Sequence, residues 1–278
     1  MLVFYKTRTM YIDFYNLKER PFNITPDPRF LMYTPGHREA YDNLLYGIKE
    51  RKGFMKMVGE VGSGKTTLCR AVLRSVPENV ESALILNPAV NEVQLISSIM
   101  KDLGLPVISH DRMQLIHSLN AYLLEQNSAK KNVVVMIDEA QELPPSVMEQ
   151  IRLLSNLETD QDKLMQIVLI GQPELDNRLA QKEFRQLRQR IMVKCRLKPL
   201  SRSETDYYID HRLLVAGAGD NLFFDDAAID IVYKVSRGLP RLVNKVCDSA
   251  MLSGYAEGTH VIGRKEVKKA VIELKGIL

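Results

Sequence analysis

The stretch VGEVGSGKTTL, residues 58–68, decides the fold of this chain. It contains Gly59, four further residues, and then Gly64, Lys65 and Thr66, between an apolar run and a helical pattern. Glycines at these positions let backbone N–H groups turn inward around phosphate oxygens, and the start of the following helix adds partial positive charge. The stretch therefore predicts a phosphate-binding loop that joins a strand to a helix.

The residues of this loop are expected to contact a nucleotide and its metal ion. Lys65 reaches the β- and γ-phosphates of ATP, and the Thr66 hydroxyl binds Mg²⁺. A chance glycine-rich turn is the alternative, but the pattern arises by chance in only about 1% of chains of this length. The expected nucleotide-binding residues are Gly59, Glu60, Val61, Gly62, Ser63, Gly64, Lys65, Thr66 and Thr67.

Short apolar runs alternate with helical patterns over the first two thirds of the chain. The runs occupy residues 54–59, 82–87, 132–138, 165–171 and 191–197. Runs that are apolar almost throughout are typical of strands buried on both faces, and alternation with helices favours a parallel sheet with helices on both sides. The sequence therefore predicts an α/β fold with five parallel strands.

The character of the chain changes after residues 198–201. Helical patterns follow at 203–216, 225–236, 240–256 and 264–275, and SRSE (201–204) is a capping box with Ser201 as N-cap and Glu204 at the third helical position. We expect three parts: an N-terminal arm (1–28), a nucleotide-binding core (29–200) and a helical lid (201–278). Residues 1–9 form a candidate extension whose native status the sequence leaves open.

Polar side chains also follow two other predicted strands, at positions where they could act on a nucleotide bound by the phosphate loop. The run 132–138 ends in Asp138, and Glu139 follows it directly. We expect Asp138 to hold Mg²⁺ through its water shell, and Glu139 to orient and deprotonate the attacking water. The next run ends in Gly171-Gln172, and we expect Gln172 to sense the γ-phosphate. The alternatives are an acidic loop start and a helix-start turn.

Bulk properties exclude several classes of protein. The chain has 278 residues with 38 basic and 34 acidic side chains, so its charge of +4 permits an anionic partner without demanding one. Its three cysteines are widely spaced and its histidines show no ligand spacing, which favours a reducing compartment and gives no metal signal from protein ligands alone. No membrane span or signal peptide is evident, so we expect a cytoplasmic location.

Together these motifs resemble the AAA+ family of P-loop NTPases, of the ASCE type. Within it the chain is similar to the general secretion pathway protein A ATPases, through residues 10–48, GEVGSGKTTLCR, IDEAQEL, LIGQPEL, LRQRI and 238–255. The resemblance implies a five-stranded parallel core with a helical lid. It also implies ATP hydrolysis, a sensor arginine at Arg241, and an arginine finger that acts on a neighbouring subunit. Arg190 is our choice for the finger, with Arg188 and Arg185 as reserves.

The resemblance also bears on partners and on the cellular role. It implies a homo-oligomer, a ring or filament, that supports secretion, pilus or exopolysaccharide assembly beside an inner-membrane partner. The resemblance covers the ATPase module alone, so we expect a short form without the membrane span and peptidoglycan-binding domain of longer members. Residues 21–41 would lie over the adenine, with Leu31, Tyr33 and Arg38 as guesses.

The stretch FRQLRQRIMVKCRLK (184–198) keeps a second interpretation open, since its charges are all basic. This is a DNA-binding AAA+ regulator, although no aromatic residues interleave the charges as base stacking would require. A third interpretation, of the whole chain, is an inactive ATPase fold that serves as a scaffold, which the intact Lys65, Thr66, Asp138 and Glu139 argue against. Lys194, Arg196 and Lys198 alternate with apolar residues, a pattern typical of a half-exposed edge strand.

Overall fold

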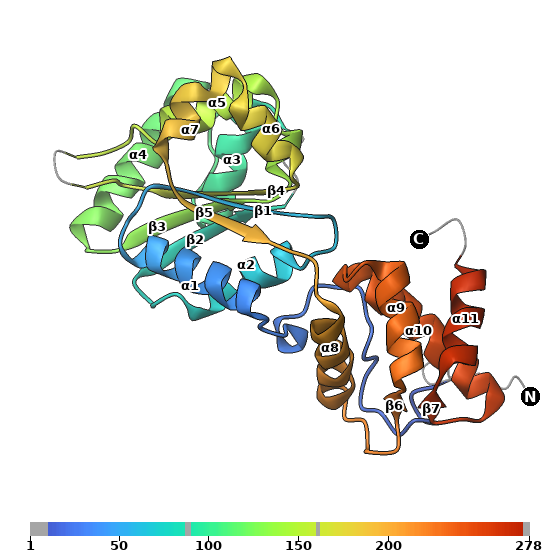
Figure 1. The fold of residues 1–278 in the computed structure, drawn as a ribbon. Helices are drawn as coiled ribbons and strands as arrows, with labels where there is room; N and C mark the ends of the chain where they lie inside the picture. Colours follow the sequence, from blue (N-terminus) through green and yellow to red (C-terminus); the bar gives the residue numbers. More distant parts are fainter. Residues whose placement is uncertain (1–10, 87–89, 160–161, 275–278) are drawn as a thin grey trace, which may run out of the picture. The chain divides into compact units, whose positions relative to one another are not determined.

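The computed structural model describes residues 11–86, 90–159 and 162–274, and these form two compact units (Figure 1). The sheet unit contains residues 35–60 and 65–197, and the helical unit contains residues 11–34, 61–64 and 198–274. The described part of the N-terminal arm thus groups with the C-terminal helices. The predicted domain boundaries, after residues 28 and 200, stay predictions.

The sheet unit is built on five strands in the order β2-β3-β4-β1-β5, and every pairing is parallel. This confirms the predicted α/β fold class. The strands are β1 (Phe54–Gly59), β2 (Val80–Ile85), β3 (Asn132–Ile137), β4 (Gln166–Gly171) and β5 (Ile191–Leu197). Only β2 differs clearly from its predicted run, because it begins and ends two residues earlier; the run's last residue, 87, lies outside the described residues.

Strand order places the polar strand ends of β1, β3 and β4 side by side. β4 lies between β1 and β3, while β2 lies at the sheet edge beyond β3. All residues of β3 and β4 are buried, which explains why their sequences are apolar without alternation. Because the strands are parallel, the loop after β1, the acidic pair after β3 and Gln172 after β4 emerge at one edge.

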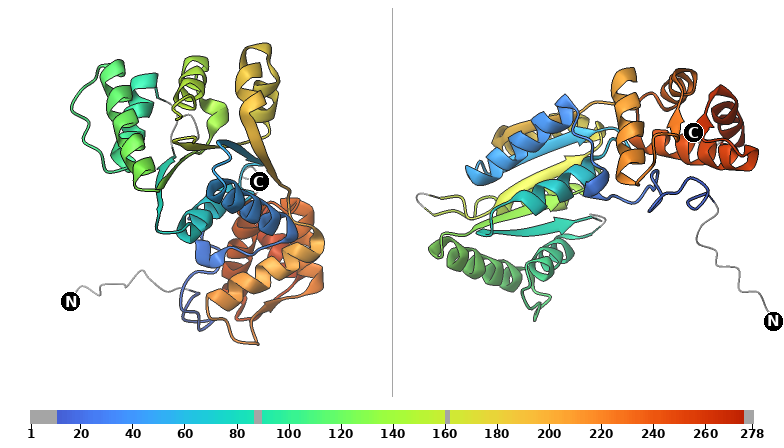
Figure 2. Two further views of the ribbon diagram at one scale, coloured as in Figure 1. Left: turned by 90° about the vertical axis from the view of Figure 1, so that its left-hand side faces the viewer. Right: turned by 90° about the horizontal axis from the view of Figure 1, so that it is seen from below.

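Helices cover both faces of this sheet, as Figures 1 and 2 show. One face packs against α1 (Pro35–Lys49) and α2 (Lys65–Ser75). The other face shares a continuous apolar core with α3 (Glu92–Asp102), α4 (Arg112–Ser128), α5 (Pro145–Leu154), α6 (Glu174–Ala180) and α7 (Arg185–Arg190). The short turns η2 (Ala140–Glu142) and η3 (Lys182–Phe184) precede α5 and α7. No helix in the described residues combines the length and apolar character needed to cross a bilayer.

Strand β5 forms the other sheet edge and pairs with β1. Cys195 and Leu197 are buried, whereas Lys194 and Arg196 are exposed. The predicted half-exposed edge strand is confirmed. Charged side chains on such an edge discourage pairing with another sheet.

The helical unit consists of α8 (Arg202–Val215), α9 (Asp226–Ser236), α10 (Pro240–Glu257) and α11 (Arg264–Glu273). The predicted capping box is confirmed at α8, where Ser201 and Glu204 cap each other's backbone N–H groups. A two-stranded parallel pair, β6 (Phe223–Phe224) and β7 (Val261–Ile262), was not predicted. These strands have two residues each, too few to show a period in the sequence.

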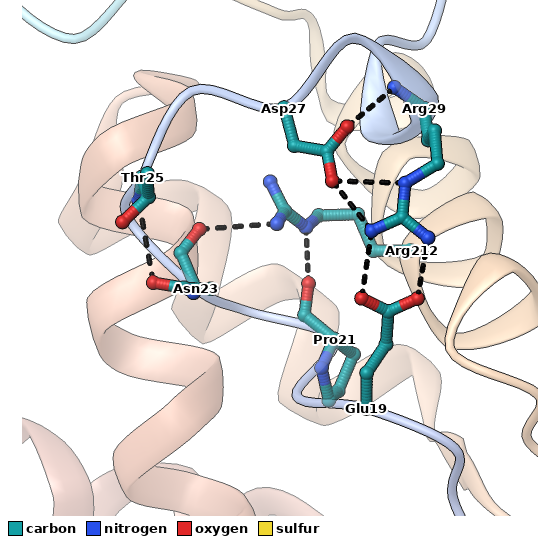
Figure 3. A network of polar contacts seen from close by, with 7 residues as sticks. All are labelled: Glu19, Pro21, Asn23, Thr25, Asp27, Arg29 and Arg212. Atoms are coloured by element: carbon teal, nitrogen blue, oxygen red, sulfur yellow. Dashed lines mark hydrogen bonds and ion pairs between the residues drawn. The ribbon is translucent and has the colours of Figure 1, made fainter.

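The N-terminal segment 11–34 is part of the apolar core of this unit. Tyr15, Phe22 and Phe30 are buried there, the last of them in the short turn η1 (Pro28–Phe30). Arg212 of α8 donates to the backbone carbonyls of Pro21 and Asn23 (Figure 3). Its guanidinium also lies 4.6 Å from the Phe30 ring centroid. Arg212 therefore fastens the segment to α8.

Candidate active site

The phosphate loop joins β1 to α2 as the sequence predicts. The Lys65 Nζ atom donates hydrogen bonds to the carbonyl oxygens of Gly59 (2.8 Å) and Glu60 (3.0 Å). Burial lowers the pKa of Lys65, and the negative charges of Glu139 and Asp138 oppose that shift. The ammonium group is thus buried at the start of α2, where the charges of two carboxylates offset part of its desolvation.

Asp138 and Thr66 meet at the same strand edge. The Thr66 Oγ1 atom lies 2.5 Å from Asp138 Oδ2, and Asp138 is only 3% exposed. The backbone N–H of Asp138 donates to the carbonyl of Ile85 (2.8 Å), and the backbone N–H of Glu139 donates to Asp138 Oδ1 (2.9 Å). These two oxygens are hydrogen-bonded to each other. Hydroxyl and carboxylate oxygens are the ligand types that Mg²⁺ prefers, directly or through its water shell, so the chemistry of the residues present fits this ion.

Glu139 follows β3 in a left-handed backbone conformation, with φ 51° and ψ 37°. This region is unfavourable for side chains with a Cβ atom, and such strain clusters at functional sites. Its Oε2 atom accepts hydrogen bonds from Gln141 Nε2 (2.7 Å) and Gln172 Nε2 (3.1 Å). Burial raises the pKa of Glu139, but these two hydrogen bonds and the charge of Lys65 outweigh it, so the net pKa is lowered.

The structure therefore brings together the predicted residues Lys65, Thr66, Asp138, Glu139 and Gln172 in the sheet unit. Gln172 follows β4 and contacts the catalytic candidate Glu139 directly. Its contact with a γ-phosphate stays a prediction.

Two residues at this site were missed by the sequence analysis. Gln141 accepts a hydrogen bond from the Gln172 backbone N–H (3.0 Å) and donates to Glu139, while Arg178 of α6 donates to the Gln141 carbonyl. A Cβ atom on Gly171 would lie 2.7 Å from Gln141 Oε1, so the glycine lets this amide approach the backbone closely. The glycine before Gln172 was the only sequence signal that a side chain packs at this point.

The other predicted site residues lie elsewhere. Arg190, at the end of α7, donates to Ser155 Oγ (2.6 Å), while Arg185 and Arg188 are exposed. In the helical unit the Arg241 backbone N–H donates to the Gly62 carbonyl (3.2 Å), and Gly62 has φ 77°. The finger and sensor roles stay predictions, as do the adenine contacts of Leu31, Tyr33 and Arg38.

Comparisons with known proteins agree with this geometry. The AAA domain family matches residues 48–179. General secretion pathway protein A of Aeromonas hydrophila is 43% identical over 269 residues, which are 96% of this chain and 49% of that protein. The chain thus spans about half the length of this relative.

Solved structures with a similar fold include proteins of low sequence identity. The Aeropyrum pernix ORC2 protein, solved as ADPNP-ADP complexes, has a TM-score of 0.72 at 20% identity and covers 92% of this chain and 72% of its own. The Thermotoga maritima RuvB Holliday junction branch migration motor has a TM-score of 0.56 at 19% identity, covering 85% and 69%. At these identities the likeness shows the fold alone.

Proposed function

Because the chain is an AAA+ protein and a relative of general secretion pathway protein A, we propose that it binds ATP with Mg²⁺ and hydrolyses it to ADP and phosphate. The supporting observation is the Glu139 carboxylate, which is half-buried and fixed by two amide donors beside Lys65 and Asp138. A kinase that transfers phosphate to a bound acceptor needs no second carboxylate to activate water.

Each residue has one task in this reaction. Lys65 and the backbone N–H groups of the loop bind the β- and γ-phosphates, and Thr66 and Asp138 hold the metal ion that neutralises their charge. Glu139 accepts the proton of the attacking water, and Gln172 orients the γ-phosphate against it. The lowered pKa of Glu139 keeps its carboxylate free of a proton at neutral pH.

We further propose that the reaction requires a second copy of the chain. Arg190 leaves Ser155 and stabilises charge on the γ-phosphate of the neighbouring subunit, while Arg241 reports the nucleotide state to the helical unit. A homo-oligomer, ring or filament, is therefore the active form. Its cytoplasmic role beside an inner-membrane partner of a secretion or envelope-assembly machine is the finer part of the proposal, supported by the relation to general secretion pathway protein A.

The nucleotide claim is tested by ATP binding and phosphate release with Lys65→Ala. We expect this variant to lose binding and turnover because the cation that meets the phosphates is gone. Lys49→Ala, an exposed lysine at the end of α1, is the control and should match the wild type. Equal ATP affinity for Lys65→Ala and Lys49→Ala would contradict the proposed site.

The cellular claim is tested with the same substitution in the source organism. Lys65→Ala at the chromosomal locus should stop export or envelope assembly while the protein is still made. Unchanged export in a strain that depends on the intact gene would contradict the secretion role.

A second candidate function is DNA binding by the exposed basic side chains of α7 and β5. Arg185, Arg188 and Lys194 are exposed there, whereas Arg196 forms an ion pair with Asp176. Phosphate contacts make binding fall steeply as salt rises. A duplex DNA titration at low and raised salt decides, since no binding at low salt removes this candidate.

A further inference from the structure

Gln141 occupies the centre of the hydrogen-bond network at the candidate active site. It is 8% exposed and lies in η2, two residues after Glu139. Its Oε1 accepts from the Gln172 N–H, and its Nε2 donates to Glu139 Oε2 and, at 3.4 Å, to Glu142 Oε1. One side chain therefore links the ends of β3 and β4.

The partners of Gln141 fix the orientation of its amide group. A backbone N–H requires an acceptor and a carboxylate requires a donor, so reversing the amide would break both contacts. The backbone is fixed as well, because Arg178 of α6 donates to the Gln141 carbonyl. The side chain thus cannot rotate without losing bonds to several elements.

This arrangement leaves the two oxygens of Glu139 in different states. Oε2 accepts from two amides, Gln141 and Gln172, while Oε1 has no hydrogen-bond partner within the described residues. An anchored carboxylate with one free oxygen is suited to accept a proton from a water molecule in a defined direction. The left-handed backbone of Glu139 alone would not set that direction, because the side chain has rotatable bonds.

We propose that Gln141 is a positioning residue for hydrolysis, which holds Glu139 and Gln172 in register so that the free Glu139 oxygen faces the attacking water. This inference rests on the proposed function. The close approach of Gly171 is consistent with it, since a Cβ atom there would lie 2.7 Å from Gln141 Oε1 and push against the amide. Gln141 itself contacts the base and not the reacting atoms.

The kinetic test uses Gln141→Met, which keeps the volume but removes both hydrogen-bonding groups, and Gln141→Asn, which keeps the amide but is too short. Both should lower kcat by about 10- to 100-fold, with KM and ATP affinity changed less than about twofold. When Glu139 is already replaced in Glu139→Gln, adding Gln141→Met should lower kcat by less than about a further twofold, because the base that Gln141 positions is gone. Gln150→Met, at a buried glutamine of α5 that Arg112 contacts, is the matched control.

A stability test of the contact does not depend on ATP turnover. Unfolding free energies of Gln141→Met, Glu139→Ala and the double variant should be non-additive, with the double change smaller than the sum. Additive values, an unchanged kcat, or a raised kcat in Gln141→Met would overturn the inference. A wild type that binds ATP without hydrolysing it would instead overturn the proposed function, while the unfolding cycle still decides the Gln141–Glu139 contact.

Discussion

The two ends of the parallel sheet differ in the charge of their buried polar groups. At the amino ends of β3 and β4, Asn132 and Gln166 are both buried and neutral: Gln166 donates to Asn132 Oδ1 (3.2 Å) and accepts from the Gly53 N–H (2.7 Å). At the carboxyl ends, the buried groups include the charged Lys65 and Asp138 beside the neutral Gln141, and Glu139 adopts a left-handed backbone.

This difference indicates that the polar groups at the amino end stabilise the sheet, whereas those at the carboxyl end serve the proposed chemistry. The neutral amides satisfy one another and the backbone, including the Ile48 carbonyl (2.7 Å), so they hold strand ends together. The carboxyl end instead gathers Lys65, Asp138 and Glu139 at a cost in desolvation that folding alone does not require. Parallel sheets bind ligands at this end, outside the carboxyl ends of their strands.

The largest effect should come from Arg190, which directly precedes β5 at the amino end of the sheet and whose proposed role is in a neighbouring subunit. Arg190→Ala is expected to lower kcat by about 10³- to 10⁵-fold, the range for arginine fingers in phosphoryl transfer. ATP affinity should change little, because Arg190 belongs to the neighbour's site. Steady-state phosphate release and nucleotide titration measure the two quantities.

Mixing two variants tests whether the active site at the carboxyl end of the sheet needs a residue from a second subunit. Arg190→Ala and Glu139→Gln proteins, each inactive, should regain activity together, since mixed interfaces contain one intact site. If no ratio of the two proteins restores turnover, the shared site is wrong and the carboxyl end needs no second subunit.

The next largest effect should appear at the amino end as a loss of stability. Gln166→Leu leaves the Gly53 N–H and Asn132 Oδ1 without this partner, and should lower the unfolding free energy by about 1–3 kcal/mol. Its kcat should stay within about twofold of the wild type. Urea unfolding measures the free energy, and phosphate release measures kcat. A lower kcat with an unchanged unfolding free energy would contradict the assignment of the amino end to stability.

The smallest effect should come from a second left-handed residue, Lys130, which has φ 58° and precedes β3 at the amino end. Lys130→Gly should raise the unfolding free energy by about 1 kcal/mol or less, since glycine relieves the strain but loses more chain entropy. Turnover should not change. A fall in kcat in Lys130→Gly would mean that the left-handed backbone at the amino end also contributes to turnover, as is proposed only for Glu139 at the carboxyl end.

The fold and much of the site follow from sequence because they depend on local patterns. Buried parallel strands are apolar throughout, and the glycine loop, Asp138 and Gln172 each mark a strand end. The order of the strands could not be predicted from the sequence, because nothing in the residues of β2 and β4 indicates that β4 lies between β1 and β3.

The rest depends on contacts between distant residues. Gln141 could not be recognised before its amide was seen beside Gln172, and Arg212 gave no sign that it fastens residues 21 and 23 to α8. The pair β6–β7 joins residues 223–224 to 261–262, and two-residue strands have no period of their own.

Phosphate release from ATP by Glu139→Gln, compared with the wild type at equal nucleotide occupancy, tests the central claim most directly. The account predicts unchanged ATP affinity and a kcat lower by about 10²- to 10⁴-fold, because the amide cannot accept the proton of water. A Glu139→Gln protein that binds and hydrolyses ATP like the wild type would contradict it.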